Sequence, residues 1–75
     1  MKNAIISLFD YTGAMVQPWI EAGYQCFIFD IQHPFMPILL QLENQANPVI
    51  VSGDYSTWDN IIDALDNEFD IKMLF

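Results

Sequence analysis

The sequence contains no arginine, two lysines and a single cysteine, Cys26. One cysteine cannot form an internal disulfide, and one cysteine with one histidine cannot complete a tetrahedral zinc site. A chain with so few basic residues lacks the positive surface that contacts with phosphate groups require. We therefore expect it to bind neither nucleic acid directly nor anionic membranes. No apolar run is long enough to span a bilayer, and the N-terminus lacks the pattern of a signal peptide, which favours a cytoplasmic protein.

Hydrophobic residues, by contrast, are abundant. They make up 53% of the 75 residues, and ten acidic residues give a net charge of -8. This composition excludes intrinsic disorder, because disordered chains are poor in aromatic and aliphatic residues. The length allows one domain, residues 1–75, close to the lower size at which a single hydrophobic core suffices. The acidic surface favours solubility and suits a basic partner.

Short apolar runs alternate with segments of helical spacing. The runs predict strands over residues 3–9, 24–29, 48–52 and 69–75. Helices are predicted over 14–22, over 38–43 and from Ser56 onward, where Ser56 and Asp59 fit a capping box. In the last helix one face is apolar and consists of Trp58, Ile61, Ile62 and Leu65. This alternation predicts an α/β fold, with a four-stranded, mostly parallel sheet and helices on both faces.

Aspartates stand at three predicted strand ends, as Asp10, Asp30 and Asp54. Ligands of parallel sheets bind at the carboxyl ends of the strands. Aspartate is also common in turns, because its side chain bonds nearby backbone. Each aspartate alone is explained as a turn residue, whereas three at successive strand ends favour a ligand site.

Three segments together resemble the opening of DNA cytosine-C5 methyltransferases and of related phage DNA methylase-like proteins. They are Leu8-Phe9-Asp10-Tyr11-Thr12-Gly13, Trp19-Ile20-Glu21-Ala22-Gly23-Tyr24 and Phe29-Asp30. The resemblance covers nearly the whole chain. It implies the cofactor half of a class I S-adenosylmethionine-dependent methyltransferase, a Rossmann-like half-domain with strand order 3-2-1-4.

The resemblance also implies a site for S-adenosylmethionine. Asp30 would accept the ribose hydroxyls, Asp54 the adenine amino group, and the loop amides would meet the methionyl carboxylate. The implied cofactor residues are Phe9, Asp10, Tyr11, Thr12, Gly13, Asp30, Ile31 and Asp54.

The chain departs from this family in two places. The loop after the first strand has one glycine, Gly13, where the family has two or three. The Pro-Cys motif that provides the family's nucleophile is missing from these 75 residues, and Cys26 lies in the middle of a predicted strand. We therefore expect a truncated DNA methyltransferase-like protein, either cofactor-binding or a remnant or subunit of a cytosine methyltransferase, that is not catalytic alone. Its expected location is the cytoplasm of a bacterium or of a phage-infected host.

An alternative function is that of a small acidic, non-enzymatic interaction protein, such as a phage inhibitor of a host nucleic-acid enzyme or defence system. In either case strand 69–75 is expected at the edge of the sheet, with only Asp70 and Lys72 as charged residues. Exposed edges recruit further strands, so we expect a homo-oligomer or a protein partner there. His33 is expected in a surface loop, and Met15, Trp19 and Trp58 are expected in the core.

Overall fold

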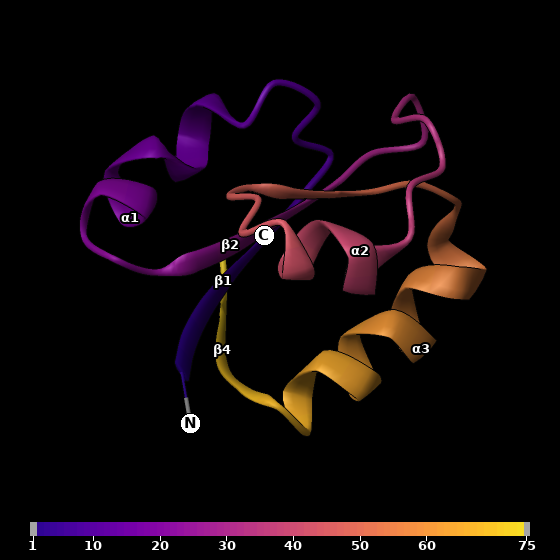
Figure 1. The fold of residues 1–75 in the computed structure, drawn as a ribbon. Coiled ribbons are helices and arrows are strands. Elements are labelled where there is room, and N and C mark those ends of the chain that lie inside the picture. The colour runs from indigo at the N-terminus through magenta and orange to yellow at the C-terminus, as the bar shows by residue number, and fades with distance from the viewer. Residues whose placement is uncertain (1, 75) are drawn as a thin grey trace.

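The computed structural model describes residues 2–74, except for the side chain of Tyr55. Its elements, in chain order, are β1 (Lys2–Leu8), the 3-10 turn η1 (Ala14–Val16), α1 (Gln17–Glu21), β2 (Gln25–Phe29), α2 (Ile38–Glu43), β3 (Val49–Val51), α3 (Tyr55–Asp66) and β4 (Phe69–Met73) (Figure 1). The predicted alternation of strands and helices is confirmed. Phe75, the last residue of the predicted strand 69–75, lies outside the described residues.

The four strands form one sheet in the order β3-β2-β1-β4. All three strand pairs are parallel, and Ile5 at the centre of β1 lies between Cys26 of β2 and Lys72 of β4. The predicted α/β, Rossmann-like half-domain with strand order 3-2-1-4 is therefore confirmed. Because the strands are parallel, the loops that follow β1, β2 and β3 emerge at the same edge of the sheet.

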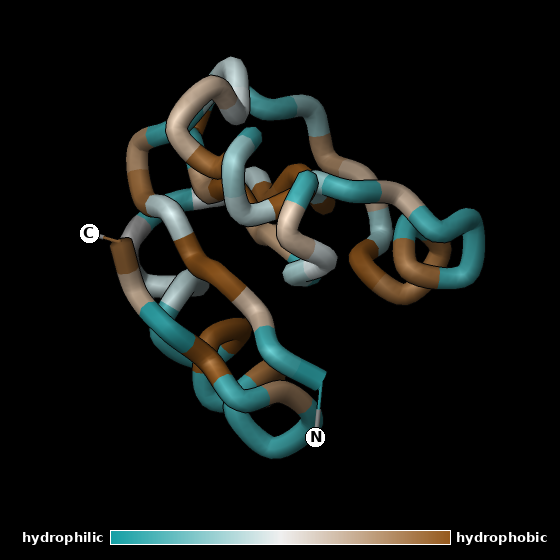
Figure 2. The backbone as a smooth tube through the Cα atoms, turned by 90° about the vertical axis from the view of Figure 1, so that its left-hand side faces the viewer, coloured by the Kyte–Doolittle hydropathy of each residue, from teal (hydrophilic) through white to brown (hydrophobic). Residues whose placement is uncertain are grey.

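Helices cover both faces of the sheet, because successive side chains of a strand point to opposite sides. On one face Ile5, Cys26 and Ile28 pack with Val16 of η1 and with Trp19 and Ile20 of α1. On the other face lie Ala4, Ile6, Phe27 and Phe29, covered by residues of α2 and α3. Figure 2 shows hydrophobic and hydrophilic positions interspersed along the chain. None of the helices in residues 2–74 has the length and apolar character needed to cross a membrane.

The longest helix, α3, buries the predicted apolar face but begins differently from the prediction. Trp58 and Leu65 are buried in the core, and Ile61 and Ile62 pack against it. The N-cap is Asp54 and not Ser56, which is a correction. The Asp54 Oδ1 accepts hydrogen bonds from the Ser56 backbone N (3.1 Å) and from the Ser56 Oγ (2.7 Å). The Ser56 hydroxyl therefore donates to the capping carboxylate and is not itself the cap.

The predicted helix over residues 14–22 is divided into η1 and α1, with Pro18 in the first turn of α1, where a proline is tolerated. The division turns Met15 outward, with 50% of its surface exposed, so the prediction that Met15 is a core residue was wrong. Val16 is buried in its place. Trp19 is half-buried, and its ring meets that of Tyr24 edge-on at 5.3 Å.

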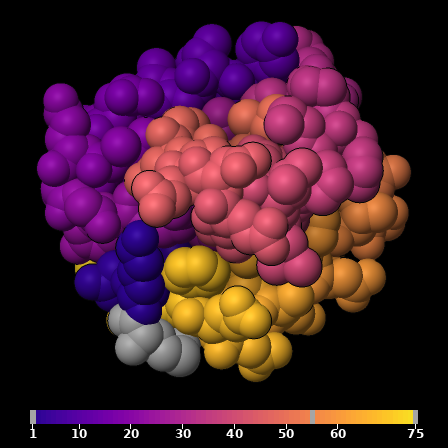
Figure 3. All heavy atoms as spheres, viewed as in Figure 1, coloured from indigo at the N-terminus to yellow at the C-terminus, as the bar shows by residue number. Residues whose placement is uncertain are grey.

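The edge of the sheet at β3 is closed by α2. The Gln41 side chain, which is buried, donates from Nε2 to the Ile50 carbonyl and accepts at Oε1 from the Ile50 N, both at 2.9 Å. These two bonds occupy the backbone groups of Ile50 that a further strand would use. Figure 3 shows the segment that contains α2 at the front of the molecule, between the N-terminal loops and α3.

Candidate functional site

The loops after β1, β2 and β3 meet at the carboxyl edge of the sheet. Asp10 N donates to the Phe29 carbonyl at 3.2 Å, and Asp30 N donates to the Val51 carbonyl at 3.1 Å. These two bonds continue the pattern of the sheet beyond the strand ends. They place Asp10 beside the end of β2 and Asp30 beside the end of β3, so two predicted site residues lie on adjacent strand ends.

Asp10 is buried, with 7% of its surface exposed. Its Oδ1 accepts a hydrogen bond from Gly13 N at 2.8 Å. Its Oδ2 is also buried and has no hydrogen-bond partner among the described residues. A buried carboxylate oxygen without a donor is unfavourable, and such atoms in folded proteins call for an explanation. The turn interpretation accounts for Oδ1 and leaves Oδ2 without a donor among the described residues.

The glycine of this loop has a conformational and a steric role. Gly13 has a φ of +79°, and a Cβ at this position would lie 3.3 Å from Pro48 Cγ and 3.4 Å from Ile28 Cδ1. Its amide bonds Asp10, and the next amide, Ala14 N, bonds Thr12 Oγ1 at 3.3 Å. The resemblance assigned the loop amides to a ligand carboxylate. Two of these amides, Gly13 N and Ala14 N, instead donate to side chains within the loop.

Around the two aspartates several apolar side chains are exposed. Asp30 is half-buried, and its Oδ1 accepts from Gln32 N at 2.8 Å. The adjacent Ile31 is 66% exposed. Phe9, with a φ of +57°, is also exposed, and its ring meets Trp58 edge-on at 5.5 Å. The edge thus combines carboxylates with apolar surface.

Asp54 differs in role from the other two aspartates, because its carboxylate caps α3. The hydrogen bond from the Ser56 side chain lowers the Asp54 pKa below its ordinary value of 3.8. A lowered pKa means that Asp54 is ionised at neutral pH, as a helix N-terminus favours.

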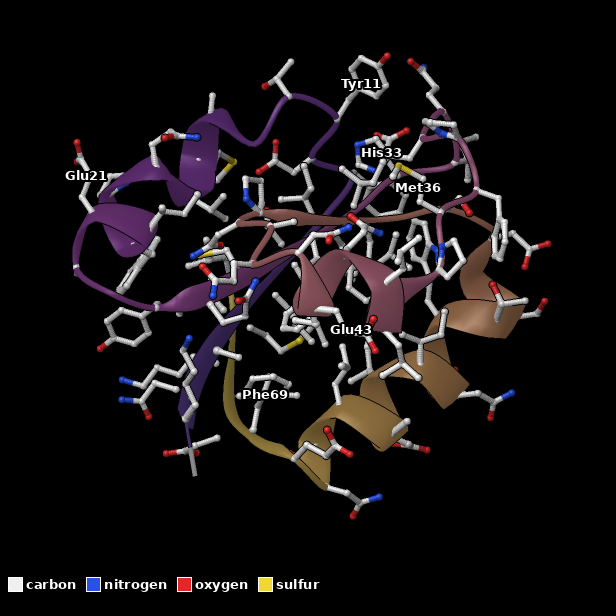
Figure 4. The ribbon with its side chains drawn as sticks, viewed as in Figure 1. Tyr11, Glu21, His33, Met36, Glu43 and Phe69 are labelled. Atoms are coloured by element: carbon white, nitrogen blue, oxygen red, sulfur yellow. The ribbon has the colours of Figure 1, made fainter. Side chains whose placement is uncertain are left out.

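His33 lies in a loop just past Asp30, where a minor binding role was open, but the expectation that it is on the surface was wrong. It is 6% exposed, with Nδ1 3.2 Å from the Val51 carbonyl and Nε2 2.8 Å from the Tyr11 carbonyl. The Tyr11 ring stacks on the imidazole at 5.2 Å (Figure 4). His33 therefore joins the loop after β1 to the end of β3. His33 N donates to the Asp30 carbonyl in a turn that reverses the chain. Aspartate is common at the first position of such turns, so Asp30 was the sequence signal that the chain turns back at His33.

Both partners of the His33 ring are carbonyl oxygens, which only accept hydrogen bonds. A neutral imidazole has one N–H and satisfies one of them, whereas the protonated ring donates to both.

An apolar pocket of about 440 Å³ opens beside this edge, between the segment before α2 and the start of α3. Its lining consists of Phe35, Met36, Pro37, Ile38, Leu39, Val51, Ser52, Gly53, Thr57 and Ile61. It includes Val51, the residue whose carbonyl bonds Asp30 N and His33. Figure 4 shows Met36 at the same end of the molecule as Tyr11 and His33. The volume and the apolar lining are typical of small-molecule sites.

The remaining reactive group is Cys26, which lies within β2, as predicted, and is buried. Burial raises the pKa of its thiol to about 11. The thiol is therefore neutral at physiological pH and does not offer a nucleophile. Within residues 2–74 no group of three or more His, Cys, Asp or Glu side chains is placed to hold a metal ion. Comparisons with protein-family models, with curated proteins and with solved structures found no match for this chain.

Proposed function

We propose that the carboxyl edge of the sheet binds S-adenosylmethionine or its product S-adenosylhomocysteine. The observation that supports this proposal is the buried Oδ2 of Asp10, which has no donor among the described residues. Such an oxygen favours a ligand that brings a hydrogen-bond donor, above all a cationic one. The α-ammonium group of the methionyl portion is a donor of this kind.

The neighbouring strand end suits the ribose. Asp30 uses Oδ1 for Gln32 N, and the second carboxylate oxygen is the acceptor that we assign to the ribose hydroxyls. Asp10 and Asp30 lie on adjacent strand ends, so one ligand can present its ammonium group to the first and its ribose to the second. The exposed Ile31 offers apolar surface beside the ribose position.

We assign the adenine ring to the apolar pocket that begins at Val51. A planar heterocycle gains from removal of apolar surface from water, at roughly 25 cal/mol per Å². In this assignment the carboxylate of Asp54 remains the cap of α3. The resemblance gave Asp54 the role of accepting from the adenine amino group. We assign that role to the polar groups of Ser52 and Thr57 at the pocket wall.

The proposal concerns cofactor binding alone. Methyl transfer to cytosine in DNA also needs a nucleophile. The buried neutral thiol of Cys26 is unsuited to attack on a base. In our proposal the nucleophile comes from a second polypeptide, and this chain acts as the cofactor-binding subunit.

Isothermal titration of the full chain with S-adenosylhomocysteine tests the proposal. We expect a dissociation constant of about 1–100 μM. Asp10→Asn keeps an acceptor for Gly13 N but places a donor at Oδ2, so we expect affinity to fall at least tenfold. Asp30→Asn should weaken binding similarly. Asp63→Asn, the same change on the exposed side of α3, should leave it unchanged. Absence of heat up to millimolar ligand would overturn the proposal.

A second function is favoured by a different surface. Asp59, Asp63 and Asp66 are exposed on α3 at spacings that place them along one side of the helix. We propose, as the alternative, that this acidic stripe binds a basic protein. This alternative predicts a complex whose affinity falls steeply with added salt and falls in the Asp63→Asn variant. It also predicts that the chain has no affinity for the cofactor.

A further inference from the structure

The two edges of the sheet differ. The β3 edge is closed by Gln41, whereas β4 pairs with β1 alone. Leu74 N donates to the Ile6 carbonyl at 2.8 Å, on the β1 side. Successive residues of a strand direct their backbone groups to opposite sides, so Ile71 and Met73 direct theirs away from β1. The outer side of β4 therefore presents unpaired backbone donors and acceptors among the described residues.

The sequence of β4 is complementary to itself. In an antiparallel pair of two β4 strands centred on Ile71, Phe69 lies opposite Met73, Asp70 lies opposite Lys72, and Ile71 lies opposite its own copy. This register also satisfies the backbone, because the outward groups of Ile71 and Met73 meet outward groups of the other strand. A two-fold axis through Ile71 produces each contact twice.

We propose that the outer edge of β4 binds a second copy of this chain in this register, to form a continuous eight-stranded sheet. The charge distribution selects this occupant. The chain carries ten acidic residues and two lysines, so most faces of one copy repel the same face of another. At β4 each copy offers one carboxylate and one ammonium group on the same side of the sheet, and the two-fold axis pairs them.

The apolar side of the strand supports the same arrangement. Phe69 and Ile71 already pack against the core beneath α3. Met73 is 47% exposed, and in the proposed register it covers, and is covered by, Phe69 of the other copy. The pairing thus removes apolar surface that a single copy leaves in water.

Sedimentation velocity on the full chain tests the proposal. We expect a species of twice the chain mass of 8.7 kDa at concentrations near 100 μM, dissociating on dilution. Asp70→Lys places two lysines opposite each other at two symmetric positions, and we expect self-association to weaken about tenfold. Lys72→Asp should weaken it similarly. The double variant, Asp70→Lys with Lys72→Asp, restores opposite charges and should return the affinity to within about threefold of the original.

A control separates this local pairing from net charge. Asp63→Lys, on the exposed side of α3, changes the net charge as much as Asp70→Lys does. It should leave association unchanged or strengthen it, because it reduces repulsion between acidic copies. Both Asp70 and Lys72 are exposed, so far-UV circular dichroism should show every variant folded. A chain that stays monomeric at all concentrations overturns the proposal, and so does a double variant as weak as the single ones.

Discussion

The side-chain amide of Gln41 bonds both backbone polar groups of Ile50, donating to its carbonyl and accepting from its N–H at 2.9 Å each. The two bonds take the place of those that a neighbouring strand would make with Ile50. A third bond, from Gln41 Nε2 to the Met36 carbonyl at 3.2 Å, holds the segment that precedes α2. The residue thus links the β3 edge to the wall of the apolar pocket, which includes Met36.

Replacement of Gln41 by leucine tests this role. Gln41→Leu keeps the volume but leaves the Ile50 groups without their partner, so we expect a loss of roughly 1–3 kcal/mol in the free energy of unfolding. Chemical denaturation would measure it. The matched control is Gln32→Leu in an exposed loop, expected to change stability by less than about 0.5 kcal/mol. Equal effects of the two variants would show that the edge contact contributes little.

The two glycines that flank η1 and α1 provide a second test. Gly13 and Gly23 both have a positive φ, but a Cβ would meet Pro48 and Ile28 at Gly13 and nothing within 4 Å at Gly23. Gly13→Ala should therefore lower stability by about 1–3 kcal/mol, because steric crowding adds to the strain of the left-handed conformation. Gly23→Ala should lower it by about 1 kcal/mol, from the backbone strain alone. Thermal unfolding of both variants measures the difference, and a larger effect at Gly23 would contradict the contacts described for Gly13.

Asp54 predicts an acid-dependent contribution to stability. The Ser56 hydrogen bond lowers the Asp54 pKa in the folded chain, so its stabilising effect is present above the ordinary value of 3.8. The effect is lost as the pH falls below 3.8 and through the lowered pKa. We expect Asp54→Ala to lower the melting temperature at pH 7 and to match the original chain more closely at pH 2–3. Asp59→Ala, which tests the capping box predicted from the sequence, should have little effect. If Asp59→Ala proves the more damaging at pH 7, the assignment of Asp54 as the cap is wrong.

Cys26 predicts slow modification of the folded chain. A pKa raised from 9.0 to about 11 lowers the thiolate fraction about 100-fold at pH 8, and burial restricts access further. We expect iodoacetamide to react at least 100-fold more slowly with the native chain than with the chain in urea. Because the folded pKa is raised, stability should decline as the pH rises from about 9 to 11. Cys26→Ala should not show this decline, and rapid native-state labelling would contradict the burial of the thiol.

The contacts of His33 link the loop after β1 to the end of β3, and this link can be tested. His33→Ala removes the contacts of both ring nitrogens with the Tyr11 and Val51 carbonyls. We expect a loss of roughly 1–3 kcal/mol and faster hydrogen exchange in residues 9–13, measured by NMR. The exposed neighbour Gln32, changed to alanine, is the control. Unchanged exchange in the loop after β1 would show that His33 does not hold it.

The sequence by itself determined the order of the elements and the parallel character of the sheet, whereas the strand order 3-2-1-4 was implied by the family resemblance. Runs such as Val49–Val51 and the spacing of Trp58, Ile61 and Leu65 repeat with the periods of a strand and a helix, and these periods depend only on local geometry. Asp10 and Asp30 were recognisable as site candidates for a related reason, since strand ends in a parallel sheet have a fixed location.

The tertiary structure alone decided the partners of individual polar groups. The burial of His33, the closure of the β3 edge by Gln41 and the missing donor at Asp10 Oδ2 each depend on where distant segments pack. The choice of Asp54 over Ser56 as the cap depends on backbone angles at the turn. Hydrogen bonds require positions correct to within a few tenths of an ångström. Periodicity in a sequence locates a residue on a face, and only the packed chain brings two groups to that distance.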